Sequence, residues 1–200
     1  MTTRRLFLAA ALALPFARPA SAQMDPARAA TFIQATGEDL VRVINSPAAV
    51  EQRRQQVATI LRRAVDIEGT GRFILGRWWR QASAAEQQEY LRLFEEVLIR
   101  NLASRFGEYQ GVTFALGRSQ QRTEDDALVT TIVQRPGSAA FNLDWRVADV
   151  NGQPRIVDLV AEGASLRLTQ RSEYSAVIQR GGNQVSALLA AMRQQIAQMR

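Results

Sequence analysis

The amino-acid sequence predicts an α+β domain in which helices pack on one face of a curved antiparallel sheet of four to five strands. Three observations carry this prediction. Apolar residues recur at helical spacing as far as Phe106, the period changes to two after Gly111, and helical spacing returns near Ser172. Helices therefore come first, an antiparallel meander follows, and helices close the chain.

The first half of the chain contains clear helix start and stop signals. Asp25 before Pro26 is a helix start, and Pro47 separates this helix from the next one. Residues 83–86 read Ser-Ala-Ala-Glu, a capping box that predicts the start of the clearest helix in the chain. Its apolar stripe runs on to Gly107, which is placed to end it.

The strands are predicted from alternation of apolar and polar residues. Between residues 140 and 147 this alternation places Leu143 and Trp145 on one face, as in a half-buried antiparallel strand. Asn151 followed by Gly152 is a strong hairpin signal. The expected strands are residues 112–116, 128–134, 140–147, 155–161 and 165–169.

The composition excludes several kinds of chemistry. The 200-residue chain has no cysteine and no histidine, so it has no disulfide, no thiolate nucleophile and no Ser-His-Asp triad. All 25 basic residues are arginine, which excludes a Schiff-base lysine and a phosphate-loop lysine. We expect neither catalytic residues nor a metal site. The formal charge of +6 is mild and evenly spread, so we expect no nucleic-acid partner.

The amino-terminal segment resembles a bacterial secretion signal. Residues 1–22 are predicted to be a cleaved signal peptide, leaving residues 23–200 as a single domain. Arg4 and Arg5 form the positive region, and residues 6–16 form an apolar run too short to span a bilayer. The paired arginines fit either the Sec or the twin-arginine route. The mature protein is expected to be soluble and outside the cytoplasm.

Two carboxylates are the best candidates for an enzymatic alternative. Asp144 and Asp158 lie on adjacent predicted strands, and paired carboxylates can serve glycoside hydrolysis or proton transfer. The structural interpretation is favoured, in which Asp144 is solvated and Asp158 pairs with an arginine or a turn. Ser165 has no histidine or lysine to activate it.

Two separated motifs resemble the MlaC, or toluene-tolerance, family of periplasmic lipid carriers. Residues 73–83 read FILGRWWRQAS, which is similar to the family's Leu-Gly-x-aromatic-aromatic segment. Asp158, Glu162, Gly163 and Ser165 match its D-x-x-x-E-G-x-S signature. Two departures are the tandem tryptophans at 78 and 79, where tyrosine often stands, and arginine at every basic position.

The resemblance implies a fold related to the nuclear-transport-factor-like cone, with an apolar cavity. It also implies a periplasmic carrier whose cargo is phospholipid and which needs no cofactor. The implied partners are an outer-membrane lipoprotein–porin complex and an inner-membrane ABC transporter complex with its substrate-binding-domain subunit. A carrier of hopanoid or another apolar lipid, a small cone-fold enzyme using Asp144 or Asp158, and a structural adaptor domain are the alternatives. We expect a monomer.

A carrier of this kind needs apolar walls in place of a catalytic centre. The headgroup is expected at the cavity mouth, where Arg171 could meet phosphate, although an ion pair at the surface is the favoured role for this arginine. The candidate lipid-binding residues are Phe73, Leu75, Trp78, Phe94, Leu98, Leu102, Phe141, Leu143, Trp145, Val157, Leu159, Leu166 and Leu168.

Overall fold

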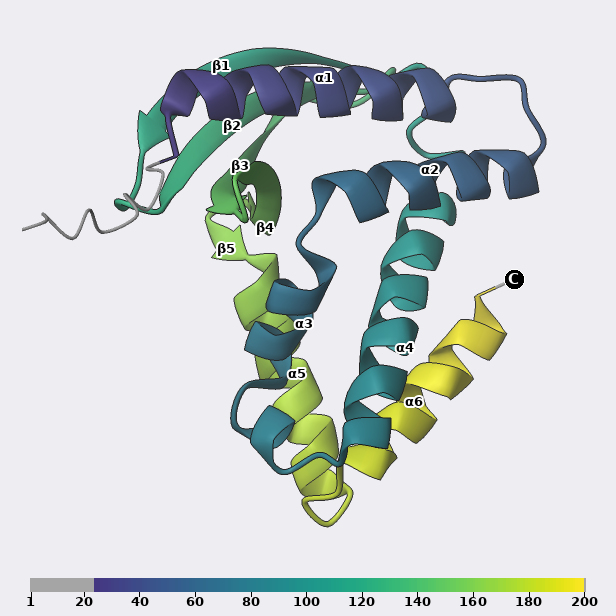
Figure 1. Ribbon diagram of the computed structural model, residues 1–200. Coiled ribbons are helices and arrows are strands. Elements are labelled where there is room, and N and C mark those ends of the chain that lie inside the picture. Colours follow the sequence, from purple (N-terminus) through teal and green to yellow (C-terminus); the bar gives the residue numbers. More distant parts are fainter. Residues whose placement is uncertain (1–23, 200) are drawn as a thin grey trace, which may run out of the picture.

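The structure is a computed structural model that describes residues 24–199 (Figure 1). The predicted signal peptide, residues 1–22, lies outside the described residues and stays a prediction. The elements are α1 (Pro26–Ile44), α2 (Val50–Ala64), α3 (Ile67–Leu75), the 3₁₀ turn η1 (Gly76–Arg80), α4 (Ala84–Ala103), β1 (Thr113–Gln121), β2 (Asp126–Gln134), β3 (Phe141–Val150), β4 (Gln153–Ala161), β5 (Ala164–Ser165), α5 (Leu166–Arg180) and α6 (Val185–Gln198).

The five strands form one open antiparallel sheet in the order β1-β2-β3-β4-β5, which confirms the predicted meander. Two tight turns lie at opposite ends of β4. Asn151 and Gly152 join β3 to β4, and both have positive φ angles of 55° and 81°. Glu162 and Gly163 join β4 to β5 with φ angles of 52° and 80°. Two consecutive residues with positive φ are the mark of a type I′ hairpin turn, which matches the twist of the strands.

Helix α1 covers one face of the sheet, which we call the inner face. It lies along β1 and β2 (Figure 1). Ile33 of α1 packs there in a buried cluster with Val129 of β2, Val147 of β3 and Ile156 of β4. Alternate residues of the same strands point to the opposite, outer face. Strand β2 is the most deeply buried strand, whereas β1 is largely exposed and β3 and β4 are mostly half-buried.

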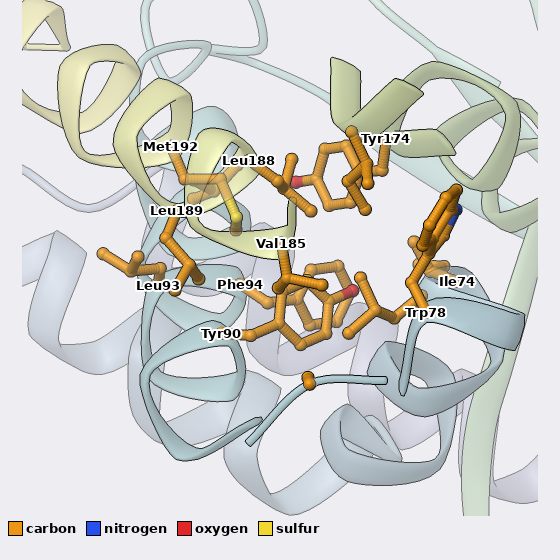
Figure 2. Packing of buried hydrophobic residues seen from close by; sticks show 14 residues of the cluster. Ile74, Trp78, Tyr90, Leu93, Phe94, Tyr174, Val185, Leu188, Leu189 and Met192 are labelled. Atoms are coloured by element: carbon orange, nitrogen blue, oxygen red, sulfur yellow. The ribbon is translucent and has the colours of Figure 1, made fainter. Parts of the chain in front are cut away.

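The remaining helices pack mainly on one another. Elements α3, η1, α4, α5 and α6 share a helical core that contains Tyr90, Phe94 and Tyr174 (Figure 2). Tyr90 stacks on Phe94 with ring centroids 5.9 Å apart, and it meets Tyr174 edge to face at 6.2 Å. The sequence predicts helices packed on one face of the sheet, and α1 is packed in this way. Most of the later helices form a separate bundle beyond the sheet (Figure 1). None of the described helices is both long enough and apolar enough to cross a membrane.

The capping box that predicts α4 is present. The Ser83 hydroxyl accepts from the backbone N–H of Glu86, and the Glu86 carboxylate accepts from the backbone N–H of Ser83. The predicted end of this helix at Gly107 is wrong, because α4 ends at Ala103 and turns fill the next eight residues. Gly111, with φ of 77°, comes at the end of these turns just before β1.

The predicted strand at residues 165–169 is also wrong. Strand β5 contains only Ala164 and Ser165, and α5 begins at Leu166, six residues before the expected start at Ser172. The Ser165 hydroxyl accepts from the backbone N–H of Leu168 at 3.2 Å and so caps a helix that begins here. The spacing of Leu166 and Leu168 resembles the alternation of a strand. In the structure both are solvent-exposed residues of the first turn of α5.

Candidate functional site

A strip of apolar side chains on the inner face is the strongest candidate for a binding surface. Phe141, Leu143 and Trp145 follow one another on β3, and Leu159 of β4 lies opposite Trp145. All four side chains are half-buried, although they face the interior of the fold. A close-packed core would bury them completely. We call these four residues the inner-face strip.

Helices α2 and α4 bring further apolar residues to the strip. Phe141 and Leu143 pack against a buried cluster that contains Val57 and Phe106, together with the half-buried Leu102. The structure thus brings together Leu102, Phe141 and Leu143 from the predicted set. It adds Leu61 of α2, which packs on the same cluster. Nothing in the sequence places the helix that carries Leu61 beside this cluster.

The indole of Trp145 is held by a hydrogen bond that removes its only polar group from the site. Its Nε1–H donates to the Thr131 hydroxyl at 2.8 Å, and that hydroxyl donates to the carbonyl of Leu143 at 3.2 Å. Thr131 is fully buried. A buried tryptophan whose N–H is satisfied presents only apolar surface to its surroundings. Thr131 is a site residue that alternation alone did not single out, because its polar side chain occupies an inward position of β2.

Three other predicted residues lie in the helical core. Leu75, Trp78 and Phe94 are at most 4% exposed and pack among α3, η1, α4, α5 and α6. Trp78 donates from Nε1 to the Ser175 hydroxyl at 3.2 Å. Figure 2 shows Phe94 among other side chains of this core and Trp78 at its margin beside Ile74. Phe73 and Leu98 are half-buried at its edge.

The last three predicted residues lie around the junction of β4 with α5. Val157 occupies a register shift, because Arg146 pairs with Asp158 while Val147 pairs with Ile156, so Val157 has no partner on β3. Such a bulge breaks the alternation on which inward and outward positions were predicted. Leu166 is 46% exposed and Leu168 is 54% exposed. They lie at the surface of the molecule.

Asp158 of the signature motif ties β4 to the start of α5. Its carboxylate accepts from the Ser165 hydroxyl at 2.6 Å and from the backbone N–H of Arg167 at 3.2 Å. The Arg167 guanidinium lies 3.3 Å from the same carboxylate. Burial raises the pKa of Asp158 above its ordinary value, and the Ser165 hydrogen bond opposes that shift. The Glu-Gly pair of the motif forms the β4–β5 turn, so the motif builds one compact corner.

We expect Asp158→Ala to lower the free energy of unfolding by about 3 kcal/mol, because it leaves Arg167 without its partner and frees the cap of α5. Asp158→Asn should lower the free energy of unfolding by less, since an amide oxygen still accepts from Ser165. Urea denaturation of the two variants checks this order. Equal stability of Asp158→Ala and the parent protein would contradict the structural role.

The carboxylate pair of the enzymatic alternative has structural partners. Asp144 and Asp158 both lie on the outer face, away from the inner-face strip. The Thr130 hydroxyl donates to Asp144 at 2.5 Å, and Asp158 is engaged at the start of α5. Within residues 24–199, no group of three or more acidic side chains is placed to hold a metal ion.

Two clefts lie on the helical side of the molecule, and the larger one is lined mostly by charged side chains. The larger has a volume of about 450 Å³ and lies between α2, α4 and α6, and the smaller has about 280 Å³ beside it. None of the thirteen predicted residues lines either cleft. The first is lined by Arg62, Arg92, Leu93, Glu95, Glu96, Arg100, Arg193 and Ile196. Its arginines are largely paired with glutamates, which makes it a poor site for an acyl chain.

The fold and the inner-face strip define an α+β protein with half-buried apolar side chains on the inner face of its sheet. Comparison with known proteins gives the family. Residues 34–194 match the family model "MlaC protein". The chain therefore belongs to the MlaC family, which confirms the resemblance of its two motifs.

Two relatives give the extent of the similarity. The chain is 22% identical over 139 residues to the "Intermembrane phospholipid transport system binding protein MlaC" of Haemophilus influenzae. That match covers 67% of this chain and 64% of the relative, so the chain spans slightly less than two thirds of it. The fold matches a phospholipid-binding protein from Ralstonia solanacearum, solved in complex with a phospholipid, with a TM-score of 0.76 and 23% identity. That match covers 86% of this chain and 98% of the other, and it supports the predicted fold class.

Proposed function

We propose that this protein is a periplasmic carrier that binds the acyl chains of a phospholipid and shuttles the lipid between outer-membrane and inner-membrane transport complexes. The inner-face strip is the observation that carries the proposal. Four apolar side chains face the interior without being fully buried. Membership of the MlaC family supports phospholipid as the cargo.

The strip suits an acyl chain on physical grounds. Each methylene removed from water contributes about 0.8 kcal/mol. A lipid already in a bilayer has its chains buried, so transfer to the carrier exchanges one apolar environment for another. The net free energy of transfer should therefore be close to zero. Direction would then come from the partner complexes, which we propose to be an outer-membrane lipoprotein–porin complex and an inner-membrane ABC transporter complex.

The thirteen predicted residues divide into three groups under this proposal. Phe141, Leu143, Trp145 and Leu159 contact the acyl chains, with Leu102 beside them. Leu75, Trp78 and Phe94 stabilise the helical core, with Phe73 and Leu98 at its edges, and Val157 lies at the bulge of β4. Leu166 and Leu168 remain at the surface. Acyl chains would enter between β3 and the side chains of α2 and α4, which must move apart to admit them.

Native mass spectrometry of the protein purified from the periplasm tests the proposal. We expect diacyl phospholipid bound to the chain, and we expect lipid-free protein to take up phospholipid from liposomes. Repeated isolation of lipid-free protein that acquires nothing from liposomes would contradict the carrier function. The mass of the bound molecule also decides between phospholipid and a hopanoid.

A further inference from the structure

The first turn of α5 exposes two leucines that the lipid site does not use. Leu166 and Leu168 are two of the most exposed large apolar residues in the described chain. They follow directly on the turn formed by Glu162 and Gly163, where the neighbouring residues are also exposed. Asp158 and Ser165 fix this corner by hydrogen bonds, so the leucines are presented on rigid backbone.

Two arginines without a carboxylate partner in the described part of the chain lie on the neighbouring segments, Arg171 farther along α5 and Arg77 in η1. Arg171 lies with its guanidinium 5.0 Å from the ring centre of Phe73, and Arg77 lies 4.5 Å from that of Trp78. Arg77 and Arg171 are both exposed. Neither guanidinium lies within 4.0 Å of a carboxylate among residues 24–199. The guanidinium of Arg171 also lies against Gly76, the residue before Arg77, so the start of η1 packs beside α5.

The local acidic groups leave this surface cationic. Arg167 is paired with Asp158, while Glu173 accepts from Gln170 and points to solvent. Glu162 is the other exposed acid nearby. A third exposed arginine, Arg80, ends η1 without a carboxylate within 4.0 Å in the described residues. Because aromatic rings hold Arg77 and Arg171 in place, their charges remain available to an external anion.

We propose that Leu166, Leu168, Arg77 and Arg171 form a docking surface for an anionic phospholipid bilayer, which we call the α5 docking surface. Exposed leucines beside arginines are the arrangement by which interfacial proteins bury apolar groups at the headgroup boundary. Arginines next to an anionic bilayer are attracted by its negative surface potential. This surface lies outside the inner-face strip, so the inference goes beyond the binding of acyl chains to the binding of the membrane itself.

Flotation with lipid vesicles tests the proposal on the full mature chain. The protein should float with vesicles containing phosphatidylglycerol at low ionic strength and much less with vesicles of phosphatidylcholine alone. High salt should release it, because salt screens exposed charges. We expect Arg171→Glu to weaken vesicle binding by about tenfold or more. Leu168→Ser should weaken it by a similar factor at constant charge.

Matched controls distinguish the effect of changing this surface from the effect of changing a charge or an apolar side chain elsewhere on the protein. Arg118→Glu on β1 makes the same charge change at an exposed arginine, and Ile132→Ser removes a side chain that is 44% exposed on the outer face. Both should bind vesicles as the parent protein does. Parent protein that does not float with anionic vesicles, or controls that lose as much binding as Arg171→Glu, would overturn the proposal. Native mass spectrometry of the same variants should show unchanged phospholipid loading, which keeps this test independent of the carrier function.

Discussion

Replacing Leu143 with glutamate is expected to abolish phospholipid loading. Leu143 lies at the centre of the inner-face strip, between Phe141 and Trp145, and packs against the cluster that α2 and α4 complete. A carboxylate there would face acyl chains without a partner, which costs several kcal/mol. The loaded fraction should fall by more than about tenfold, since 1.4 kcal/mol already changes an equilibrium constant by that factor.

Ile132→Glu is the matched control for this change. Ile132 lies on the outer face of β2, opposite Asn142, the residue next to Leu143. It is solvent-exposed, so the same carboxylate there should leave loading intact. Native mass spectrometry gives the loaded fraction, and circular dichroism shows whether each variant is folded. If Leu143→Glu does not fold, the smaller Leu143→Ser serves instead. Full loading of the folded variant would show that β3 does not contact the cargo.

Replacing Phe94 with alanine is expected to lower the free energy of unfolding by about 3–5 kcal/mol. Phe94 is 3% exposed and stacks on Tyr90, so its removal leaves a cavity in the middle of the helical core. Tyr90 is itself fixed by a hydrogen bond from its hydroxyl to the carbonyl of Gly71 at 3.0 Å. The surrounding side chains therefore have little freedom to close the space.

Chemical denaturation measures this loss, with Val50→Ala as a control at an exposed position. Phospholipid loading, expressed per folded molecule, should be unchanged in Phe94→Ala under conditions where the variant stays folded. A variant as stable as the parent protein but unable to load lipid would contradict the assignment of Phe94 to the helical core. Phe94 would then contact the cargo, as the sequence analysis predicted.

Local signals in the sequence predicted much of the fold. The capping box at Ser83 and Glu86 acts on the backbone groups of its own first turn, and the hairpin at Asn151 and Gly152 depends on two adjacent residues. Alternation in β3 correctly put Leu143 and Trp145 on one face, because the strand is regular there. These features depend on neighbours in the chain, which a sequence displays directly.

The errors arise where distant parts of the chain decide the outcome. Ser165 caps α5 while its hydroxyl also donates to Asp158 on another element, and the leucines that follow show strand-like alternation. The bulge at Val157 comes from pairing with β3, so the sequence of β4 alone does not reveal it. Whether an apolar residue such as Phe94 is core or lining depends on which helices pack around it, and spacing along one helix cannot specify that.

The absence of cysteine from the chain permits a direct test of where the lipid lies. Leu143→Cys and Ile132→Cys each introduce a single thiol, one in the inner-face strip and one on the outer face. Both variants are reacted with a thiol reagent before and after phospholipid is loaded from liposomes. We expect loading to protect the thiol of Leu143→Cys strongly and to leave the thiol of Ile132→Cys unaffected. Equal reactivity of the thiol from Leu143→Cys in the loaded and lipid-free protein would contradict it.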